Sequence, residues 1–274
     1  MIVGFGTSMP EMAVSIEAMS DGMSEIAIGN IIGSNIANIL LILGISALIA
    51  PFCLKDDLIK RDVSMMIFAT ILLCSLGLFG VLGIFEGLIM LTILLSYITY
   101  SYLQDKKNSS DHNIIDIDSE LGFAKNFNLP VSIICSVFGM ALLIAGASLF
   151  LKGSIAIAER FDISKEVIGL GIVAIGSCLP ELTTSIIASI KKHGDIVIAG
   201  IVGSNIFNIL SIVGVMSLVD NFSFPNQILK FDLWIFLFAT LTLSFFLLKG
   251  IKFSRKIGFA FLASYAAYLY ALFF

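Results

Sequence analysis

The chain has 274 residues, of which 58% are hydrophobic and only 13% are charged, and its formal net charge is −4. Soluble domains carry roughly twice that charged fraction, so the composition excludes an ordinary soluble protein. The net charge is modest and there is no basic patch, which excludes nucleic acid as a partner.

Long apolar stretches predict an all-α polytopic membrane protein, because each reaches the ~20 residues needed to cross a bilayer core. We expect nine spans, at about residues 1–20, 25–50, 62–81, 84–103, 130–158, 166–190, 195–219, 229–248 and 253–273. They divide the chain into a first half at 1–103, a polar cytoplasmic loop at 104–129 and a second half at 130–274. The apolar start lacks a basic segment and a cleavage site, so a signal peptide is not predicted.

The basic residues predict how the spans are oriented. Alternate loops carry twelve Lys and Arg residues on one side and four, Lys152, Arg160, Lys165 and Lys230, on the other. Since Lys and Arg are enriched in cytoplasmic loops, the side with twelve is expected to be cytoplasmic. We therefore expect an integral membrane protein of the plasma (inner) membrane of a prokaryote.

Residues 2–49 are repeated at 172–219 without a gap, with 21 identities in 48 positions. The identities include GSNIANIL against GSNIFNIL, and also Pro10 with Pro180 and Glu11 with Glu181. The turn after the first span lies outside and its counterpart after the sixth lies inside, so the copies are expected to have opposite topology. Inverted repeats are typical of secondary transporters, whose substrate site lies at the midplane between the copies.

Each copy places one carboxylate within an apolar span. A charged carboxylate at the bilayer centre costs at least ~2.5 kcal/mol, and a bound cation offsets that cost directly. Helical spacing puts small polar side chains at i−4, i−3 and i+4 on the face of each acid. These are Thr7, Ser8 and Ser15 beside Glu11, and Ser177, Cys178 and Ser185 beside Glu181.

Proline and the following span add further oxygen atoms. Pro10 cannot donate to the carbonyl of Gly6, nor Pro180 to that of Gly176, so each leaves a backbone oxygen without its helical donor. The next spans carry Ser34 with Asn38 and Ser204 with Asn208, each pair at i, i+4. Apart from Cys178 the set is all oxygen, which suits hard cations such as Ca²⁺ and Na⁺. Asn35 and Asn205, one position off that face, are expected to form interhelical hydrogen bonds.

The motifs GFGTSMPE with GNIIGSNIANILLILG, and AIGSCLPEL with GSNIFNILSIVG, resemble those of the sodium/calcium exchanger family of the cation/calcium antiporter superfamily, particularly its prokaryotic members. The two motif regions cover about a third of the chain. The long span at 130–158 leading into EVIGLGIVAIGS is also similar to the family.

The resemblance implies an inverted-repeat antiporter bundle of ten transmembrane helices, of which nine are present here, and four cation sites around the two glutamates. It implies exchange of Ca²⁺ for Na⁺ by alternating access, through sliding of the first and sixth helices, with no enzymatic activity and no organic cofactor. The implied ligands are Thr7, Ser8, Glu11, Ser34, Asn38, Ser177, Glu181, Ser204 and Asn208.

Three departures from the family pattern bear on function. Cys178 stands where the family commonly has serine, and its thiol is a poor ligand for a hard cation, so one Na⁺ position is expected to be weakened. Asn208 stands where potassium-dependent members carry an aspartate, so dependence on K⁺ is not expected. The first helix of the sliding pair is not found in these residues.

Three alternatives to Na⁺/Ca²⁺ exchange stay open at this point. The two glutamates could titrate, which favours a Ca²⁺/H⁺ exchanger. A non-antiporting cation channel and an inactive truncated homologue of the same fold are the others. No phosphate-binding loop, nucleophile elbow or HExxH pattern is present, so ATP-driven pumping and hydrolysis are not predicted.

Overall fold

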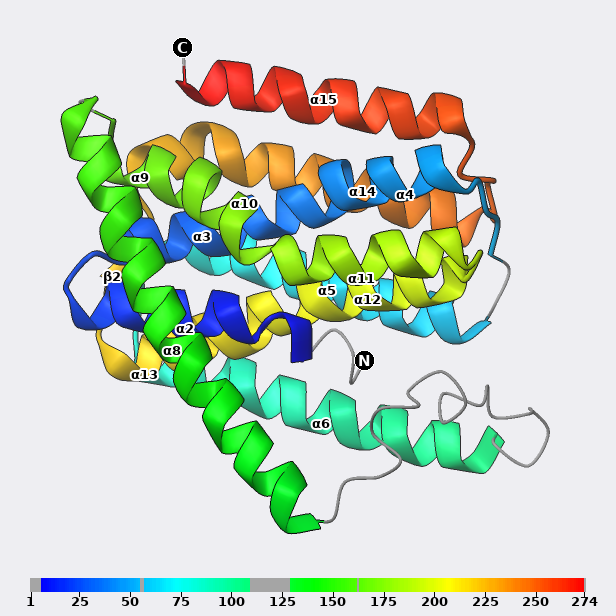
Figure 1. The fold of residues 1–274 in the computed structure, drawn as a ribbon, viewed down its shortest axis with the longest axis horizontal. Coiled ribbons are helices and arrows are strands. Elements are labelled where there is room, and N and C mark those ends of the chain that lie inside the picture. The colour runs from blue at the N-terminus through cyan, green and yellow to red at the C-terminus, as the bar shows by residue number, and fades with distance from the viewer. Residues whose placement is uncertain (1–5, 55–56, 109–128, 162, 274) are drawn as a thin grey trace.

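The computed structural model describes residues 6–54, 57–108, 129–161 and 163–273. It is a bundle of helices, in which most of the predicted spans are found within a few residues of their expected ends (Figure 1). Residues 109–128 of the predicted cytoplasmic loop lie outside the described residues. The preceding helix continues to Asn108, five residues beyond the expected end of its span.

The first half contains the following elements: α2 (Met9–Ser20), α3 (Ser24–Ala37), η1 (Asn38–Ile42), α4 (Leu43–Ile49), α5 (Asp57–Phe79), β1 (Val81–Leu82) and α6 (Ile84–Asn108). The segments labelled η are π-helical turns that continue the helices around them. Thus α3, η1 and α4 form one continuous rod from Ser24 to Ile49.

The second half begins with α8 (Leu129–Arg160), which crosses the bundle obliquely in Figure 1. It continues with α9 (Lys165–Val167), η3 (Ile168–Val173), α10 (Ala174–Ser177), α11 (Leu179–Ile190), α12 (Gly194–Phe207), η4 (Asn208–Ile212) and α13 (Val213–Val219). The last elements are β2 (Phe222–Ser223), η5 (Ile228–Asp232), α14 (Leu233–Leu248) and α15 (Arg255–Phe273).

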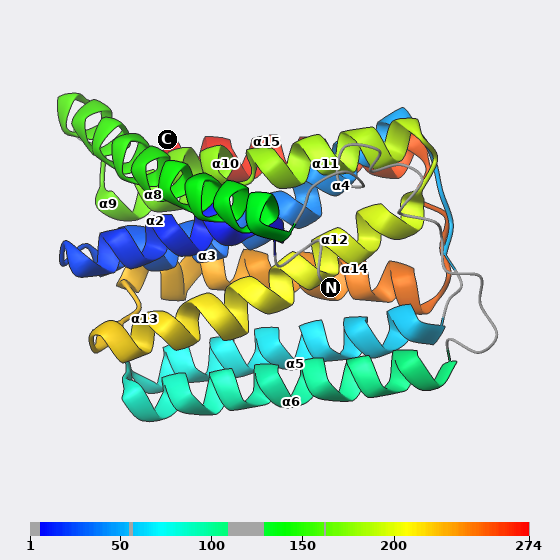
Figure 2. The same cartoon turned by 60° about the horizontal axis from the view of Figure 1, so that its bottom comes forward.

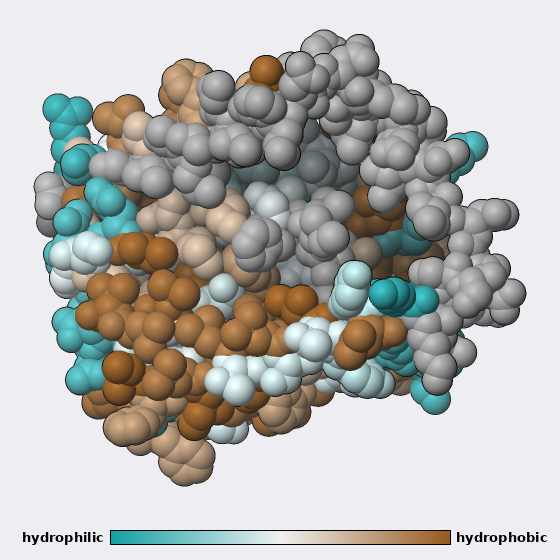
Figure 3. Space-filling view, turned by 90° about the horizontal axis from the view of Figure 1, so that it is seen from below, coloured by the Kyte–Doolittle hydropathy of each residue, from teal (hydrophilic) through white to brown (hydrophobic). Residues whose placement is uncertain are grey.

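Six helices among the described residues are long and apolar enough to cross a membrane, and the bent pair at Lys165–Ser177 and Leu179–Ile190 would make a seventh. The count of nine spans therefore remains a prediction. The outer surface over α6 is largely hydrophobic between hydrophilic ends (Figure 3). It includes Phe85, Leu88 and Leu95, which are exposed in the isolated chain. An exposed apolar face of this extent suits contact with lipid.

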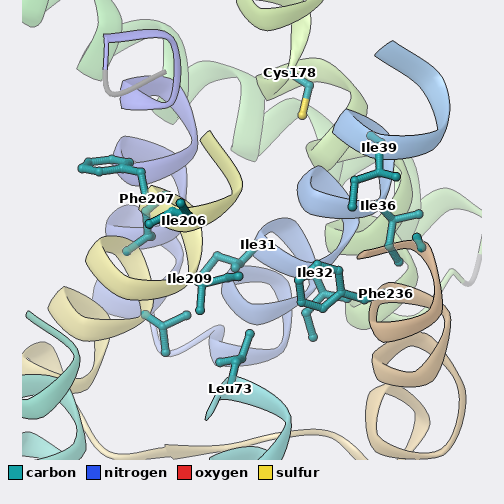
Figure 4. Close-up of a cluster of buried hydrophobic side chains, with 14 of the residues drawn as sticks. Ile31, Ile32, Ile36, Ile39, Leu73, Cys178, Ile206, Phe207, Ile209 and Phe236 are labelled. Atoms are coloured by element: carbon teal, nitrogen blue, oxygen red, sulfur yellow. The ribbon is translucent and has the colours of Figure 1, made fainter. Parts of the chain in front are cut away.

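The rods that contain α3 and α12 form the centre of the bundle. In each rod, 83% of an apolar stretch of 18 residues is buried, against 28% of the corresponding stretch in α6 and α15. Figure 4 shows how isoleucines of both rods meet in a common core, with Ile31 facing Ile209 and with Leu73 and Phe236 from α5 and α14 closing the cluster. The conserved GSNI segments of the repeat therefore lie on the most buried rods.

The two repeated segments fold into the same series of elements, but they run in opposite directions. In Figures 1 and 2, the α3–α4 rod begins at the end of the bundle where the α12–α13 rod finishes, so the two rods are antiparallel. The turn that precedes each rod contains one residue with positive φ, Gly22 at 70° and its counterpart Lys192 at 64°. A lysine in this left-handed region is uncommon, so the turn geometry is retained even where glycine is not.

The last helix of each half packs against the central rod of the other half. Helix α6 packs against α13, and α15 packs in the same way against α4. At one end of the bundle β1 pairs with β2 through Leu82 and Phe222. At the other end, Phe52 forms the equivalent bridge with Phe253.

Candidate cation site

Both acidic motifs lie where a helix is interrupted. Residues 6 and 7 are helical, the helix breaks at Ser8, and α2 begins again with Pro10 in its first turn. The second copy breaks at Cys178 in the same way, with φ −75° and ψ 1° against −85° and 9° at Ser8, and its two parts are bent by 44°. Since proline has no N–H to donate, each break falls just before the proline. Glu11 and Glu181 therefore lie in the first turn of a helix within an interrupted span.

Hydrogen bonds across the bundle bring the two motifs together. The hydroxyl of Ser8 donates to Oε1 of Glu181 at 3.0 Å. Thr7 and Ser204 are 3.5 Å apart between their hydroxyl oxygens, and their counterparts Ser177 and Ser34 are 3.4 Å apart. The same contact is thus made twice, each time between the interrupted helix of one copy and the central rod of the other.

Both carboxylates lie buried inside the bundle. Glu11 is completely buried, Glu181 is 4% exposed, and the two are close enough to repel each other electrostatically. Neither carboxylate oxygen of Glu11 has a hydrogen-bond partner within the described part of the chain, nor does Oε2 of Glu181. Buried charge is normally paired or bound to a metal, so three carboxylate oxygens are left for a cation.

The two asparagines predicted as ligands begin π-helical turns. Asn38 starts η1 and Asn208 starts η4. Asn38 donates to Oδ1 of Asn205 at 3.0 Å, which is the interhelical hydrogen bond expected for Asn205. The same prediction was wrong for the amide of Asn35, which donates to the carbonyl of Ile31 within its own helix. The side-chain oxygens of Asn38 and Asn208 are buried without a partner among the described residues. Single π-turns in α-helices occur frequently at functional sites.

Cys178 lies beside this otherwise all-oxygen set. Its thiol is buried and donates to the carbonyl of Ser34 over 3.8 Å. It corresponds to Ser8, the residue that donates to Glu181, and it is close enough to interact with Glu11. The two halves of the site therefore differ by a hydroxyl and a thiol at equivalent places.

Asn30 is a central residue that the sequence analysis missed. Its Nδ2 donates to Ser15 Oγ at 3.0 Å and to the carbonyl oxygen of Glu11 at 3.3 Å. Its Oδ1 accepts from Ser177 at 3.1 Å and from Ser34 at 3.4 Å. The repeat contains the signal that could have revealed it, because position 30 is one of the few polar positions of the first motif that its copy does not keep.

A third buried acid, Asp232, was also missed. It is completely buried at the start of α14 and accepts a 3.0 Å hydrogen bond from the hydroxyl of Tyr268. Asp62 and Tyr97, at corresponding places in α5 and α6, form the same bond at 2.6 Å. This duplicated pair lies outside the ungapped repeat, which is why the motif comparison did not show it.

The structure thus pairs six of the nine predicted ligands by side-chain contacts: Thr7 with Ser204, Ser8 with Glu181, and Ser34 with Ser177. Glu11 is connected to them through its backbone carbonyl, which accepts from Asn30. Asn38 and Asn208 lie one helical turn further along the same rods. In the regions that the structure describes, no three His, Cys, Asp or Glu side chains gather as a metal cluster. Two acids with hydroxyl and amide oxygens make a donor set of moderate charge that could hold a hard cation.

Comparisons with known proteins identify the family of the chain. The profile of the family described as sodium/calcium exchanger protein matches residues 1–103 and 131–274. Among curated relatives, the sodium/calcium exchanger MaX1 of Methanosarcina acetivorans is 32% identical, covering 100% of this chain and 87% of its own length. The inner membrane protein YrbG of Escherichia coli is 32% identical, covering 80% of this chain and 67% of its own.

A solved structure shows the same arrangement of helices. It is that of the sodium-calcium exchanger NCX_Mj soaked with 2.5 mM Na⁺ and 0.1 mM Ca²⁺, which superposes with a TM-score of 0.73 at 29% sequence identity. The match covers 100% of this chain and 85% of that one.

Proposed function

Because the chain belongs to the sodium/calcium exchanger protein family, we propose that it is a membrane antiporter that exports Ca²⁺ in exchange for Na⁺. One observation carries the proposal: the Ser8–Glu181 bond joins two acidic motifs whose carboxylate oxygens are buried and largely without protein partners. Two carboxylates neutralise one Ca²⁺ or two Na⁺, so the same pocket can take either ion in turn.

The proposed ligands are the nine oxygen-bearing residues expected from the sequence. Carboxylate, hydroxyl and amide oxygens are what Ca²⁺ takes in its irregular shell of six to eight ligands. The hydroxyl contacts between Thr7 and Ser204, and between Ser34 and Ser177, support a site shared by both copies. In this proposal the thiol of Cys178 lowers the quality of one Na⁺ position.

We further propose that the two halves are inverted repeats, and that they open the ion site to each side of the membrane in turn. Support comes from the opposite directions of the α3–α4 and α12–α13 rods in Figures 1 and 2. The paired bridges, Leu82 with Phe222 and Phe52 with Phe253, also lie at opposite ends of the bundle. Interrupted helices at the interface of inverted repeats are the usual place for a transported ion.

The proposed location is the plasma (inner) membrane of a prokaryote. The side whose loops contain twelve Lys and Arg residues in the sequence would face the cytoplasm, since basic loops are retained there. In that orientation Lys191, Lys192 and Arg255 would lie inside and Lys230 outside. Ca²⁺ export would then be driven by Na⁺ entering down its gradient.

The decisive experiment is ⁴⁵Ca²⁺ uptake into vesicles that contain the purified chain. We expect uptake when the vesicles are loaded with Na⁺, and none when Na⁺ is equal on both sides. Uptake driven instead by a pH gradient would indicate a Ca²⁺/H⁺ exchanger. Flux with no counter-ion requirement would indicate a channel, and Ca²⁺ binding without flux would indicate an inactive homologue.

A further inference from the structure

The two halves of the proposed site are not equivalent, and the difference lies at one repeated position. Asn30 in the first copy corresponds to Gly200 in the second. Asn30 is completely buried and connects four groups through its amide: Ser15, Ser34, Ser177 and the backbone of Glu11. Gly200 has no side chain with which to make any of these contacts.

A small cavity is found where the missing amide would lie. It has a volume of about 20 Å³ and is lined by Gly200 together with Thr7, Glu181, Thr184 and Ser185. Thr7, Glu181 and Ser185 are the counterparts of Ser177, Glu11 and Ser15, three of the four residues that Asn30 holds. A Cβ atom built on Gly200 would meet no other heavy atom within 4 Å, so the space is open on the glycine side.

Part of the role of Asn30 is taken by another side chain. Thr184, whose counterpart is the apolar Val14, donates from its hydroxyl to the carbonyl oxygens of Glu181 and Pro180, both at 3.0 Å. The backbone of Glu181 is therefore satisfied without an asparagine. What remains is a small cavity, lined also by Ile196 and Ile201, next to Ser185 and to a carboxylate whose Oε2 is buried without a protein partner among the described residues.

Such a cavity suits one water molecule. A site for water needs about 10–15 Å³ on this measure and two to four polar partners, and both conditions are met here. A water that bridges a protein group and a bound ion is nearly as favourable as a direct hydrogen bond, and the shell of Ca²⁺ readily includes water.

Building on the proposed function, we propose that the cavity beside Gly200 is a water site that replaces the Asn30 amide in the second half. Glu11 then holds its cation through a dry, amide-supported shell, whereas Glu181 holds it through a shell that includes an exchangeable water. Gly200 is thus a positioning residue, and it makes the Glu181 half the adaptable half of the site.

The direct test is a high-resolution structure of the purified full chain with Ca²⁺, for the native protein and for Gly200→Asn and Gly200→Ala. We expect a water peak between Ser185 and Glu181 in the native protein and in Gly200→Ala, whose methyl group would meet no other heavy atom within 4 Å. In Gly200→Asn the amide should occupy that place. A dry cavity in the native protein, or a water that persists beside the new asparagine, would overturn the proposal. This result does not depend on whether the chain transports ions.

The functional test uses shortened acids. A water can bridge the gap left by one methylene, so Glu181→Asp should keep more than about a third of native ⁴⁵Ca²⁺ uptake, whereas Glu11→Asp should lose about tenfold or more. In a Gly200→Asn background, Glu181→Asp should lose uptake as Glu11→Asp does. In an Asn30→Gly background, Glu11→Asp should keep uptake as Glu181→Asp does. Equal sensitivity of the two acids in the native background would contradict the proposal. If the native protein shows no uptake, the same comparison is made on Ca²⁺ binding by calorimetry.

Discussion

The hydroxyl of Ser8 donates a 3.0 Å hydrogen bond to the carboxylate of Glu181, although 173 residues separate them in the chain. Ser8 lies three residues before Glu11, so this bond connects the acid of one copy to the motif of the other. The corresponding contact on the other side would run from Cys178 to Glu11, where a thiol takes the place of the hydroxyl. The site is therefore shared between the two halves, and each half depends on the other for its geometry.

Removing either charge should abolish Ca²⁺ exchange. Glu11→Gln or Glu181→Gln leaves a divalent ion with one carboxylate in a buried site, and breaking a buried ionic contact costs about 3–5 kcal/mol. Affinity should then fall by a factor of about 100 or more. The measurement is Na⁺-driven ⁴⁵Ca²⁺ uptake, with membrane insertion checked by purification of each variant. Native exchange by either variant would refute the site.

Replacing the thiol should improve Na⁺ binding. In Cys178→Ser a hydroxyl oxygen takes the position of sulfur, and oxygen is the better ligand for a hard cation. One additional favourable contact is worth about 1 kcal/mol, so the Na⁺ concentration for half-maximal exchange should fall about fivefold. The control is Cys53→Ser, since the thiol of Cys53 is exposed and donates to the carbonyl of Gly250 instead. An unchanged Na⁺ titration would show that the thiol does not limit sodium binding.

The duplicated Asp–Tyr pairs should differ in their effect on stability. Tyr268→Phe leaves Asp232 buried without its hydrogen-bond donor, which costs about 1–3 kcal/mol. The unfolding temperature of the purified protein should fall by about 2–4 °C for each kcal/mol of lost stability in a chain of this size. Tyr97→Phe is the matched control, because Asp62 is 21% exposed and also paired with Arg61 at 2.8 Å. The prediction is wrong if the two variants lose the same amount.

Close contact between α3 and the η3–α10 segment should make Gly33 intolerant of any side chain. A Cβ atom there would overlap the backbone of Leu170 and approach Ala174 to 2.7 Å. Overpacking of this kind costs about 1–3 kcal/mol, so Gly33→Ala should lower the unfolding temperature and the yield from membranes. Gly146→Ala on α8 is the control, since a Cβ atom there meets nothing within 4 Å. Equal stability of both variants would mean that α3 and the η3–α10 segment can move apart at no cost.

Much of the site could be read from the sequence because its chemistry is local and duplicated. Glu11 with Pro10, and Glu181 with Pro180, predict an interrupted helix with an acid at the break, and the structure interrupts both helices there. The pairs Ser34–Asn38 and Ser204–Asn208 follow from helical spacing alone. Apolar length and composition similarly predicted the helical membrane architecture, since each depends only on residues that are close in the chain.

Contacts between distant segments were decided by the tertiary structure. Asn30 gains its role from the side chains it meets on two other helices, and Gly200 matters only because an amide is missing from a space that packing creates. The bond between Asp232 and Tyr268 joins residues 36 positions apart, in different helices. Helical periodicity fixes which face a residue occupies, but which helix covers that face depends on how all the helices pack together. The sequence by itself therefore determined which groups could bind a cation, and the fold decided which of them share one space and which half of that space has room for water.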